Sequence, residues 1–215
     1  MDGRQIEALF TRGDGSYLFA RWRRPIVPVV FGVAEESLPA IKGAIEAVVA
    51  LAGHRMAETD AEMGANLMIF AFRDWDELLA VPKLEGLVPE LAGVVGRLQA
   101  AGANQYRVFR VEADGAIRAA FVFLRMDAAL TEVPAETLAL AQAAQVMLLW
   151  SDRAFAGSSP LARVGEKVIL RPEIAGVIRA GYDPVLPEVA RDPAHALRLA
   201  ARLAAGGLST VDKSE

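Results

Sequence analysis

The pair Asp114-Gly115 constrains the fold more than any other feature of this 215-residue sequence. It separates two runs rich in aromatic and β-branched residues, 106–112 and 117–126. An Asp-Gly pair tolerates the positive φ angles that a two-residue hairpin turn requires, and runs of this composition favour extended backbone. The sequence therefore predicts an antiparallel β-hairpin over residues 104–126 that turns at Asp114-Gly115.

Hydrophobic spacing and helix-start residues place the other elements around this hairpin. Apolar residues recur at helical spacing over 37–52 and 87–100, whereas 66–72 is a short apolar run typical of a buried strand. Asp74 and Glu77 form a capping-box pattern that begins a short helix. We also expect strands at 17–22 and 26–33, paired with each other, and helices at 2–10, 134–150, 172–181 and 192–205.

The order of these elements favours an α+β fold. Strands dominate the first 126 residues and helices the remainder, without the regular alternation of a doubly wound fold. We expect a mixed or antiparallel sheet that contains the hairpin, is packed by helices, and is followed by a helical C-terminal third. Because 53% of the 215 residues are hydrophobic and 23% are charged, the chain can bury one substantial core. We predict a single domain over residues 1–205 and a flexible tail over 206–215.

Residues 134–150 form the most apolar helical segment. Its hydrophobic side chains cover nearly the whole helix surface, which predicts a central element buried on most sides. The segment is interrupted by Gln142 and Gln145 and is too short to cross a bilayer. The first ten residues lack the pattern of a secretory signal, which favours the cytoplasm by default, or the envelope if the chain is a trimmed product.

Composition argues against several classes of function. The net charge of −4 and the pI near 5.4 provide no general attraction to phosphate backbones, so we expect no nucleic-acid partner. There is no cysteine, the only histidines are His54 and His195, and no phosphate-binding glycine motif or Gly-x-Ser-x-Gly motif occurs. We therefore expect no metal and no cofactor. The sequence leaves open a protein partner and the oligomeric state.

Two segments of the C-terminal third carry a resemblance to a known family. Residues 142–152, QAAQVMLLWSD, look like a decayed His-Glu-Glu active helix and its following loop. Residues 178–184, IRAGYDP, are similar to a Leu-Arg-x-Leu-Tyr-Asp-Pro segment downstream of that helix. On these residues the chain resembles an uncharacterised proteobacterial domain-of-unknown-function family whose envelope proteins look like zincin-type metallopeptidases. The resemblance implies a zincin-like fold over the chain.

The same segment departs from the family in its chemistry. No histidine occurs between Glu136 and Trp150, and one carboxylate cannot supply both a metal site and a separate base for the attacking water. The resemblance therefore implies a pseudoenzyme, and we expect a non-catalytic binding or scaffolding protein that uses the groove beside residues 136–150. The alternative is an enzyme of unrecognised type with a carboxylate and arginine cluster, formed by Asp152, Arg163, Glu166, Arg171 and Arg179.

Overall fold

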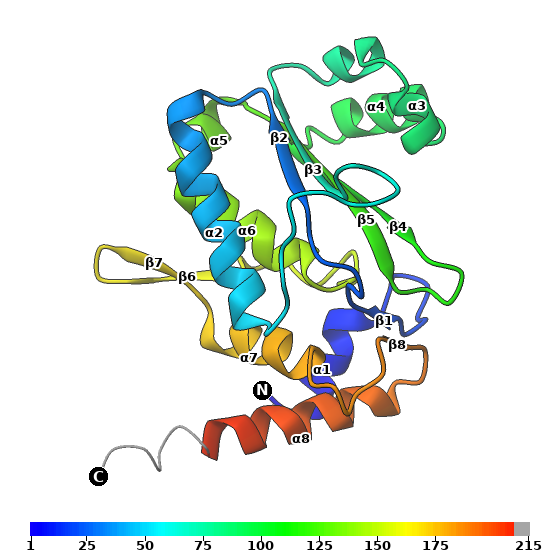
Figure 1. Ribbon diagram of the computed structural model, residues 1–215, viewed down its shortest axis with the longest axis vertical. Coiled ribbons are helices and arrows are strands. Elements are labelled where there is room, and N and C mark those ends of the chain that lie inside the picture. Colours follow the sequence, from blue (N-terminus) through cyan, green and yellow to red (C-terminus); the bar gives the residue numbers. More distant parts are fainter. Residues whose placement is uncertain (209–215) are drawn as a thin grey trace.

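A four-stranded mixed sheet forms the centre of the protein in a computed structural model, which describes residues 1–208. Its strand order is β2-β3-β5-β4; the first three strands are mutually parallel, and β4 is an antiparallel edge strand (Figure 1). The sheet confirms the α+β prediction. The strands are β2 (Pro28–Phe31), β3 (Leu67–Phe72), β4 (Gln105–Val111) and β5 (Ile117–Arg125).

Helices cover both faces of this sheet (Figure 1). Side chains of the central strand β5 alternate between the two faces: Val122 joins the larger core cluster, whereas Phe121 and Phe123 join the smaller one. This alternation follows from the period of two in a strand and explains why β5 is apolar on both faces from Ala119 to Leu124. The larger cluster contains α2 (Leu38–Leu51) and α6 (Ala135–Val146), and the smaller contains η2 (Trp75–Ala80), α3 (Leu84–Leu87) and α4 (Leu91–Ala100).

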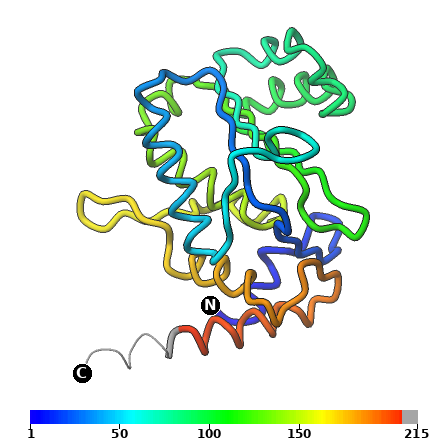
Figure 2. The backbone as a smooth tube through the Cα atoms, in the orientation of Figure 1, coloured from blue at the N-terminus to red at the C-terminus, as the bar shows by residue number. Residues whose placement is uncertain are grey.

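The two ends of the chain pack together below the sheet. Helix α1 contacts α8, and α8 contacts α7, so the first and last helices lie side by side (Figure 2). The short strands β1 and β8 pair antiparallel beside them, while β6 and β7 form a separate hairpin. These elements are α1 (Gly3–Phe10), β1 (Phe19–Ala20), η1 (Glu35–Ser37), α5 (Ala128–Thr131), β6 (Leu161–Val164), β7 (Lys167–Leu170), α7 (Pro172–Gly181), β8 (Val189–Ala190) and α8 (Ala194–Leu208).

The predicted hairpin is confirmed, although its turn is longer than two residues. The N–H of Glu112 donates to the carbonyl of Ala116 at 2.8 Å, which leaves Ala113, Asp114 and Gly115 in the loop. Gly115 has φ of 100°, as expected for the glycine of a three-residue hairpin loop. The capping boxes at Asp2 and Asp74 are also present, which agrees with the helix starts predicted there.

Three predictions about the elements were wrong. The strands at 17–22 and 26–33 do not pair with each other, because β1 pairs with β8 and β2 pairs with β3. Helix α6 ends at Val146 rather than at residue 150, since Leu148 forms an antiparallel bridge with Arg21. The C-terminal third is not only helical, because it also contains β6, β7 and β8. The first two errors concern short segments whose structure depends on a distant partner, whereas the missed β6-β7 hairpin is a local pairing.

A row of four aromatic rings crosses all strands of the sheet on the face covered by α4. Phe31 stacks on Phe70 and Phe70 on Phe123, with ring centroids 4.9 and 5.3 Å apart. Tyr106 completes the row at 6.3 Å from Phe123. Each ring lies directly opposite the next in the strand register, so one contact joins each pair of neighbouring strands.

The predicted domain end at residue 205 falls inside α8, which continues to Leu208. The rest of the predicted tail, 209–215, lies outside the described residues. Within residues 1–208, no helix has both the length and the apolar character needed to cross a membrane.

Candidate functional site

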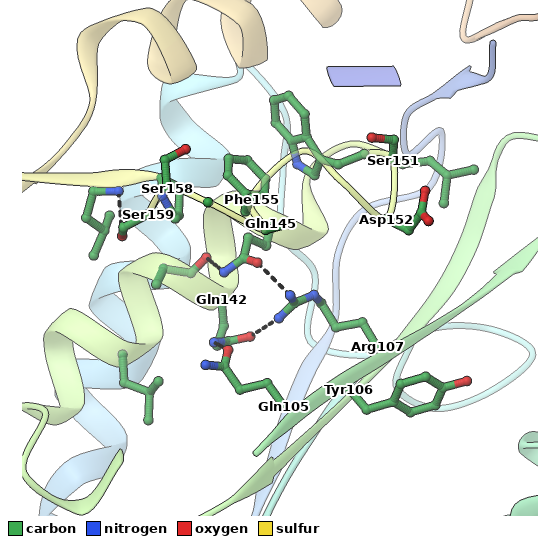
Figure 3. Close-up of a pocket in the computed structure, with 18 of the residues that line it drawn as sticks. Gln105, Tyr106, Arg107, Gln142, Gln145, Ser151, Asp152, Phe155, Ser158 and Ser159 are labelled. Atoms are coloured by element: carbon green, nitrogen blue, oxygen red, sulfur yellow. Dashed lines mark hydrogen bonds between the residues drawn. The ribbon is translucent and has the colours of Figure 1, made fainter. Parts of the chain in front are cut away.

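A cleft of about 1280 Å³ lies between the edge strand β4, helix α6 and the loop that follows α6. Strand β4 contributes Gln105, Arg107 and Phe109 to its lining, and α6 contributes one face. Residues 12–14, 149–152 and 155–161 complete the lining, and Figure 3 labels Ser151, Asp152, Phe155, Ser158 and Ser159 among them. The cleft is therefore at the location where we expected the groove beside residues 136–150.

Strand alternation directs Arg107 into this cleft. It is two residues from both Gln105 and Phe109, so the three side chains share the face of β4 that is turned toward α6. Its cross-strand partner is Val122, a residue of the larger core cluster. A long cationic side chain therefore extends from the edge of the sheet toward a mostly apolar helix.

Two glutamine side chains of α6 hold the guanidinium of Arg107 (Figure 3). Nη1 of Arg107 donates to Oε1 of Gln142 at 2.7 Å, and Nη2 donates to Oε1 of Gln145 at 2.6 Å. Gln142 in turn donates from Nε2 to Oε1 of Gln105 at 2.8 Å, and Gln145 donates to the carbonyl of Ala141 at 3.2 Å. Both amide groups are thereby fixed with their oxygens toward the cation.

The positive charge of Arg107 has no counter-charge among the described residues. No carboxylate of residues 1–208 lies within ion-pair distance of its guanidinium. Burial lowers the pKa of Arg107 to about 10, so it is still protonated at neutral pH. Since a guanidinium has five N–H donors and the glutamines take two, three remain. This arrangement can accept an anion.

The remainder of the cleft combines apolar side chains with polar and charged ones, among them Arg12, Asp14 and Asp152. Leu138, Leu149 and Phe155 line it, together with Trp150, whose ring is stacked on Phe10 with centroids 5.2 Å apart. Trp150 also donates from Nε1 to the carbonyl of Ala144 at 3.0 Å, which fixes the start of the loop. The loop residues 156–159 are exposed to solvent.

Of the five residues of the predicted carboxylate and arginine cluster, only Asp152 lines the cleft. Its carboxylate accepts a hydrogen bond from the N–H of Gly13 at 3.2 Å. Arg163 and Glu166 are exposed on the β6-β7 hairpin, and Arg179 is exposed near the end of α7. Arg171 pairs with Glu173, so among the described residues no ion pair joins two members of the predicted cluster.

The face of α6 turned to the cleft carries no metal-ligating set. Leu138, Ala141, Gln142 and Gln145 line the cleft, whereas Ala139 is buried in the larger core. Within the part of the chain that the structure describes, no group of three His, Cys, Asp or Glu side chains could hold a metal ion.

The sequence contains two signals for this site that the predicted polar cluster missed. Gln142 and Gln145 interrupt an apolar helix, and their spacing of three residues places them on one face. By the period of two in a strand, Arg107 shares one face of the predicted hairpin with Gln105 and Phe109, so that face carries a cation. Which face of α6 meets which edge of the sheet is a tertiary property that neither signal contains.

Comparison with known proteins does not identify a family for this chain. No protein-family model matches the chain, and neither does a curated protein or a solved structure. The zincin-like resemblance therefore stays a prediction, and the chain is assigned to no family.

Proposed function

We propose that this chain is a non-catalytic binding protein whose cleft receives a ligand that carries a carboxylate. The observation that supports this most strongly is the partly buried guanidinium of Arg107, which has two buried amide oxygens as partners and no anion. A buried charge without a counter-charge is costly, whereas a bound carboxylate would satisfy its free N–H donors. A planar carboxylate also matches the fork geometry of a guanidinium.

The lining of the cleft favours an organic acid over an inorganic anion. Leu138, Leu149 and Phe155 add apolar surface to the cleft that Arg107 lines. The same lining contains one further cation, Arg12, and two carboxylates, Asp14 and Asp152, which disfavour a highly charged anion. Ligand sites of this kind combine an apolar lining with a small number of polar groups that fix orientation. The ligand class we infer is therefore a monovalent carboxylate attached to an apolar group.

The pseudoenzyme hypothesis is compatible with the same cleft and with carboxylate binding by Arg107. Under the resemblance, α6 corresponds to the helix that holds zinc in an active member, and its cleft face here carries Gln142 and Gln145. These amides bind the cation of Arg107. We propose that a fixed guanidinium replaces a metal ion as the positive group of the cleft. The purified protein should then contain no stoichiometric zinc by elemental analysis, and one tightly held zinc per chain would contradict this part of the proposal.

A thermal-shift experiment with matched ligands tests carboxylate binding. Butyrate and 4-phenylbutyrate should raise the melting temperature of the wild-type protein, and 4-phenylbutyrate should be the more effective of the two. Butyramide and 4-phenylbutyramide have nearly the same shape without the charge, so they should have little effect. The Arg107→Gln variant should lose the response to the acids, whereas Arg163→Gln, at an exposed arginine outside the cleft, should retain it. Equal responses to acids and amides, or an unchanged response in Arg107→Gln, would reject the proposal.

A further inference from the structure

The geometry points to an extended peptide segment of a partner protein as the ligand, added to the free edge of β4 as a fifth strand with an acidic side chain on Arg107. This inference rests on the proposed function, because it places the carboxylate of the ligand on the same guanidinium. The partner is then a protein, its segment runs antiparallel to β4, and its sequence follows a definite pattern. Four features of β4 and the cleft support strand addition.

The first feature is the direction of the main-chain groups of β4. The N–H of Arg125 donates to the carbonyl of Asn104, so these two residues form a hydrogen-bonded pair across β4 and β5. Hydrogen-bonded and non-hydrogen-bonded pairs alternate along an antiparallel ladder. Gln105, Arg107 and Phe109 consequently direct their N–H and C=O groups away from β5. The bond from the N–H of Ala120, opposite Phe109, to Asn66 on the β3 side agrees with this assignment.

The second feature is that these outward main-chain groups belong to the residues whose side chains line the cleft. Strand β4 ends the sheet, so its outer edge has no strand partner among the described residues. Gln105, Arg107 and Phe109 all belong to the cleft lining. An added strand would therefore pair with the main chain of β4 and place every second side chain on the cleft face.

The third feature is the absence of the usual protection of an edge strand. Edge strands are commonly blocked by proline, charged side chains, bulges or a covering element. Residues 105–109 contain neither proline nor lysine, and the irregularity of the ladder begins only between Arg110 and Val111. The one charged side chain of this stretch, Arg107, opposes pairing only with a strand that brings no acidic residue opposite it. A regular stretch that directs three residues outward is thus available for pairing.

The fourth feature is the size of the cleft. Its volume of about 1280 Å³ exceeds the range of about 300–1,000 Å³ that is usual for small-molecule sites. An extended segment of several residues fills more of this volume than a small acid does. The apolar wall next to Arg107 then receives the side chains that flank the acidic residue.

The geometry of strand pairing predicts a sequence pattern for the partner segment. Directly opposite residues of an antiparallel pair have Cβ atoms about 4.5–5.5 Å apart on the same face. A glutamate opposite Arg107 therefore lies beside the guanidinium. We choose the antiparallel direction because such pairs are more frequent and slightly more stable than parallel ones. The residue two positions before the glutamate then faces Phe109 and is apolar, and the residue two positions after it faces Gln105 and is polar.

Isothermal titration calorimetry with short acetylated, amidated peptides tests this inference. The probe contains Phe-Thr-Glu-Thr-Gln within a threonine and valine background. Replacing its glutamate by glutamine should weaken binding by about tenfold or more, since a charge-assisted bidentate contact is lost. Reversing the order to Gln-Thr-Glu-Thr-Phe should also weaken binding, and equal affinity for the reversed peptide would reject the antiparallel register.

Backbone methylation separates strand addition from simple charge recognition. The N–H of the glutamate that faces Arg107 would donate to β4, whereas the N–H of the next residue points away. Methylating the first nitrogen should weaken binding by about tenfold, and methylating the second should leave it nearly unchanged. If both methylated peptides bind as well as the parent while Arg107→Gln still abolishes the response to 4-phenylbutyrate, strand addition is wrong and the proposed function stands. If neither the acids nor the peptide bind, both are wrong.

Discussion

Nη2 of Arg107 lies 2.6 Å from Oε1 of Gln145, a contact between a partly buried cation and a neutral amide oxygen. Buried arginines are ordinarily paired with carboxylates, because the attraction to a full negative charge offsets the loss of hydration. Here the glutamines of α6 accept hydrogen bonds from Arg107 but carry no negative charge. A carboxylate placed at one of these positions would supply the missing counter-charge.

Replacing Gln145 by glutamate should stabilise the ligand-free protein. The substitution keeps the size of the side chain and adds the missing negative charge beside Arg107, but it loses the bond from Nε2 of Gln145 to the carbonyl of Ala141 and carries the desolvation cost of a buried carboxylate. The expected net gain in the free energy of unfolding is about 1 kcal/mol. Urea denaturation measures the gain. The variant should also lose its response to 4-phenylbutyrate, because the internal carboxylate occupies the same donors. In the double variant Arg107→Met with Gln145→Glu, the new carboxylate is buried without a partner, so its free energy of unfolding should fall below that of wild type. If the single variant Gln145→Glu is less stable than wild type, Arg107 does not lack a counter-charge in the folded protein.

The stability of the protein should depend on pH through His195. This side chain is 2% exposed, shares a 3.0 Å hydrogen bond with the hydroxyl of Tyr17, and has a pKa lowered from 6.5 to about 4, first by burial and then by Arg198. Between these two values the unfolded chain binds a proton that the folded chain does not. The contribution of His195 to stability is therefore lost progressively as the pH falls from 6.5 toward 4, and amounts to about 3 kcal/mol.

The His195→Gln variant isolates this contribution. Carboxylates titrate alike in both proteins, so their contribution cancels when the variant and wild-type unfolding free energies are compared at each pH. The stability difference between the two proteins should shrink on acidification from neutral pH to about pH 4. A difference that stays constant over this range would show that His195 titrates normally in the folded protein.

Truncation of Leu148 to alanine should be strongly destabilising. Leu148 is 0% exposed, in the extended segment after α6 that bridges to Arg21. Removing its methyl groups from a close-packed core costs about 2–5 kcal/mol. The matched control is Leu79→Ala, because Leu79 is 50% exposed, and a surface change of this kind usually costs within about 0.5 kcal/mol. Equal midpoints of urea unfolding for the two variants would contradict the placement of Leu148 in the core.

Gly32 should not tolerate alanine, for a reason separate from backbone strain. Its φ is +76°, and a Cβ at this position would lie 1.9 Å from the carbonyl oxygen of Ala71 on the neighbouring strand. Gly53 has a similar φ of +66° but nothing within 4 Å of a Cβ, so Gly53→Ala is the matched control. The control should lose about 1–2 kcal/mol from the left-handed conformation alone. Gly32→Ala should lose at least about 2 kcal/mol more, because the clash is with backbone.

Sequence patterns predicted the elements that are determined locally. The hairpin at Asp114-Gly115, the capping boxes and the helix over 38–51 follow from turn chemistry and periodicity within a few residues. The missed β6-β7 hairpin is an exception, since its two strands are adjacent in the chain. Another failure is the segment 19–20, whose strand partner lies at 189–190. Pairing over such a separation depends on the closure of the whole fold, which no local pattern contains.

The candidate site shows the same division. The amides of Gln142 and Gln145 and the cation of Arg107 are each visible in the sequence, but about 35 residues of chain separate them, and only the packing of α6 against the sheet brings them together. The predicted cluster instead combined charged residues close to one another in the C-terminal third, such as Arg163 and Arg171. Charge pairing alone does not identify the partners of Arg107, because the oxygens that hold its guanidinium belong to uncharged amides.

The row formed by Phe31, Phe70, Phe123 and Tyr106 bears on how the sheet assembles. Side chains alternate with a period of two, so a slip of one residue in any of the four strands would send its ring to the opposite face and leave a gap in the stack. Two of the three junctions in this sheet are parallel and have no tight turn to align their strands. The four rings therefore favour one register between segments that are distant in the chain. A misaligned pairing of these strands loses ring contacts within the sheet itself, independently of the helices that cover that face.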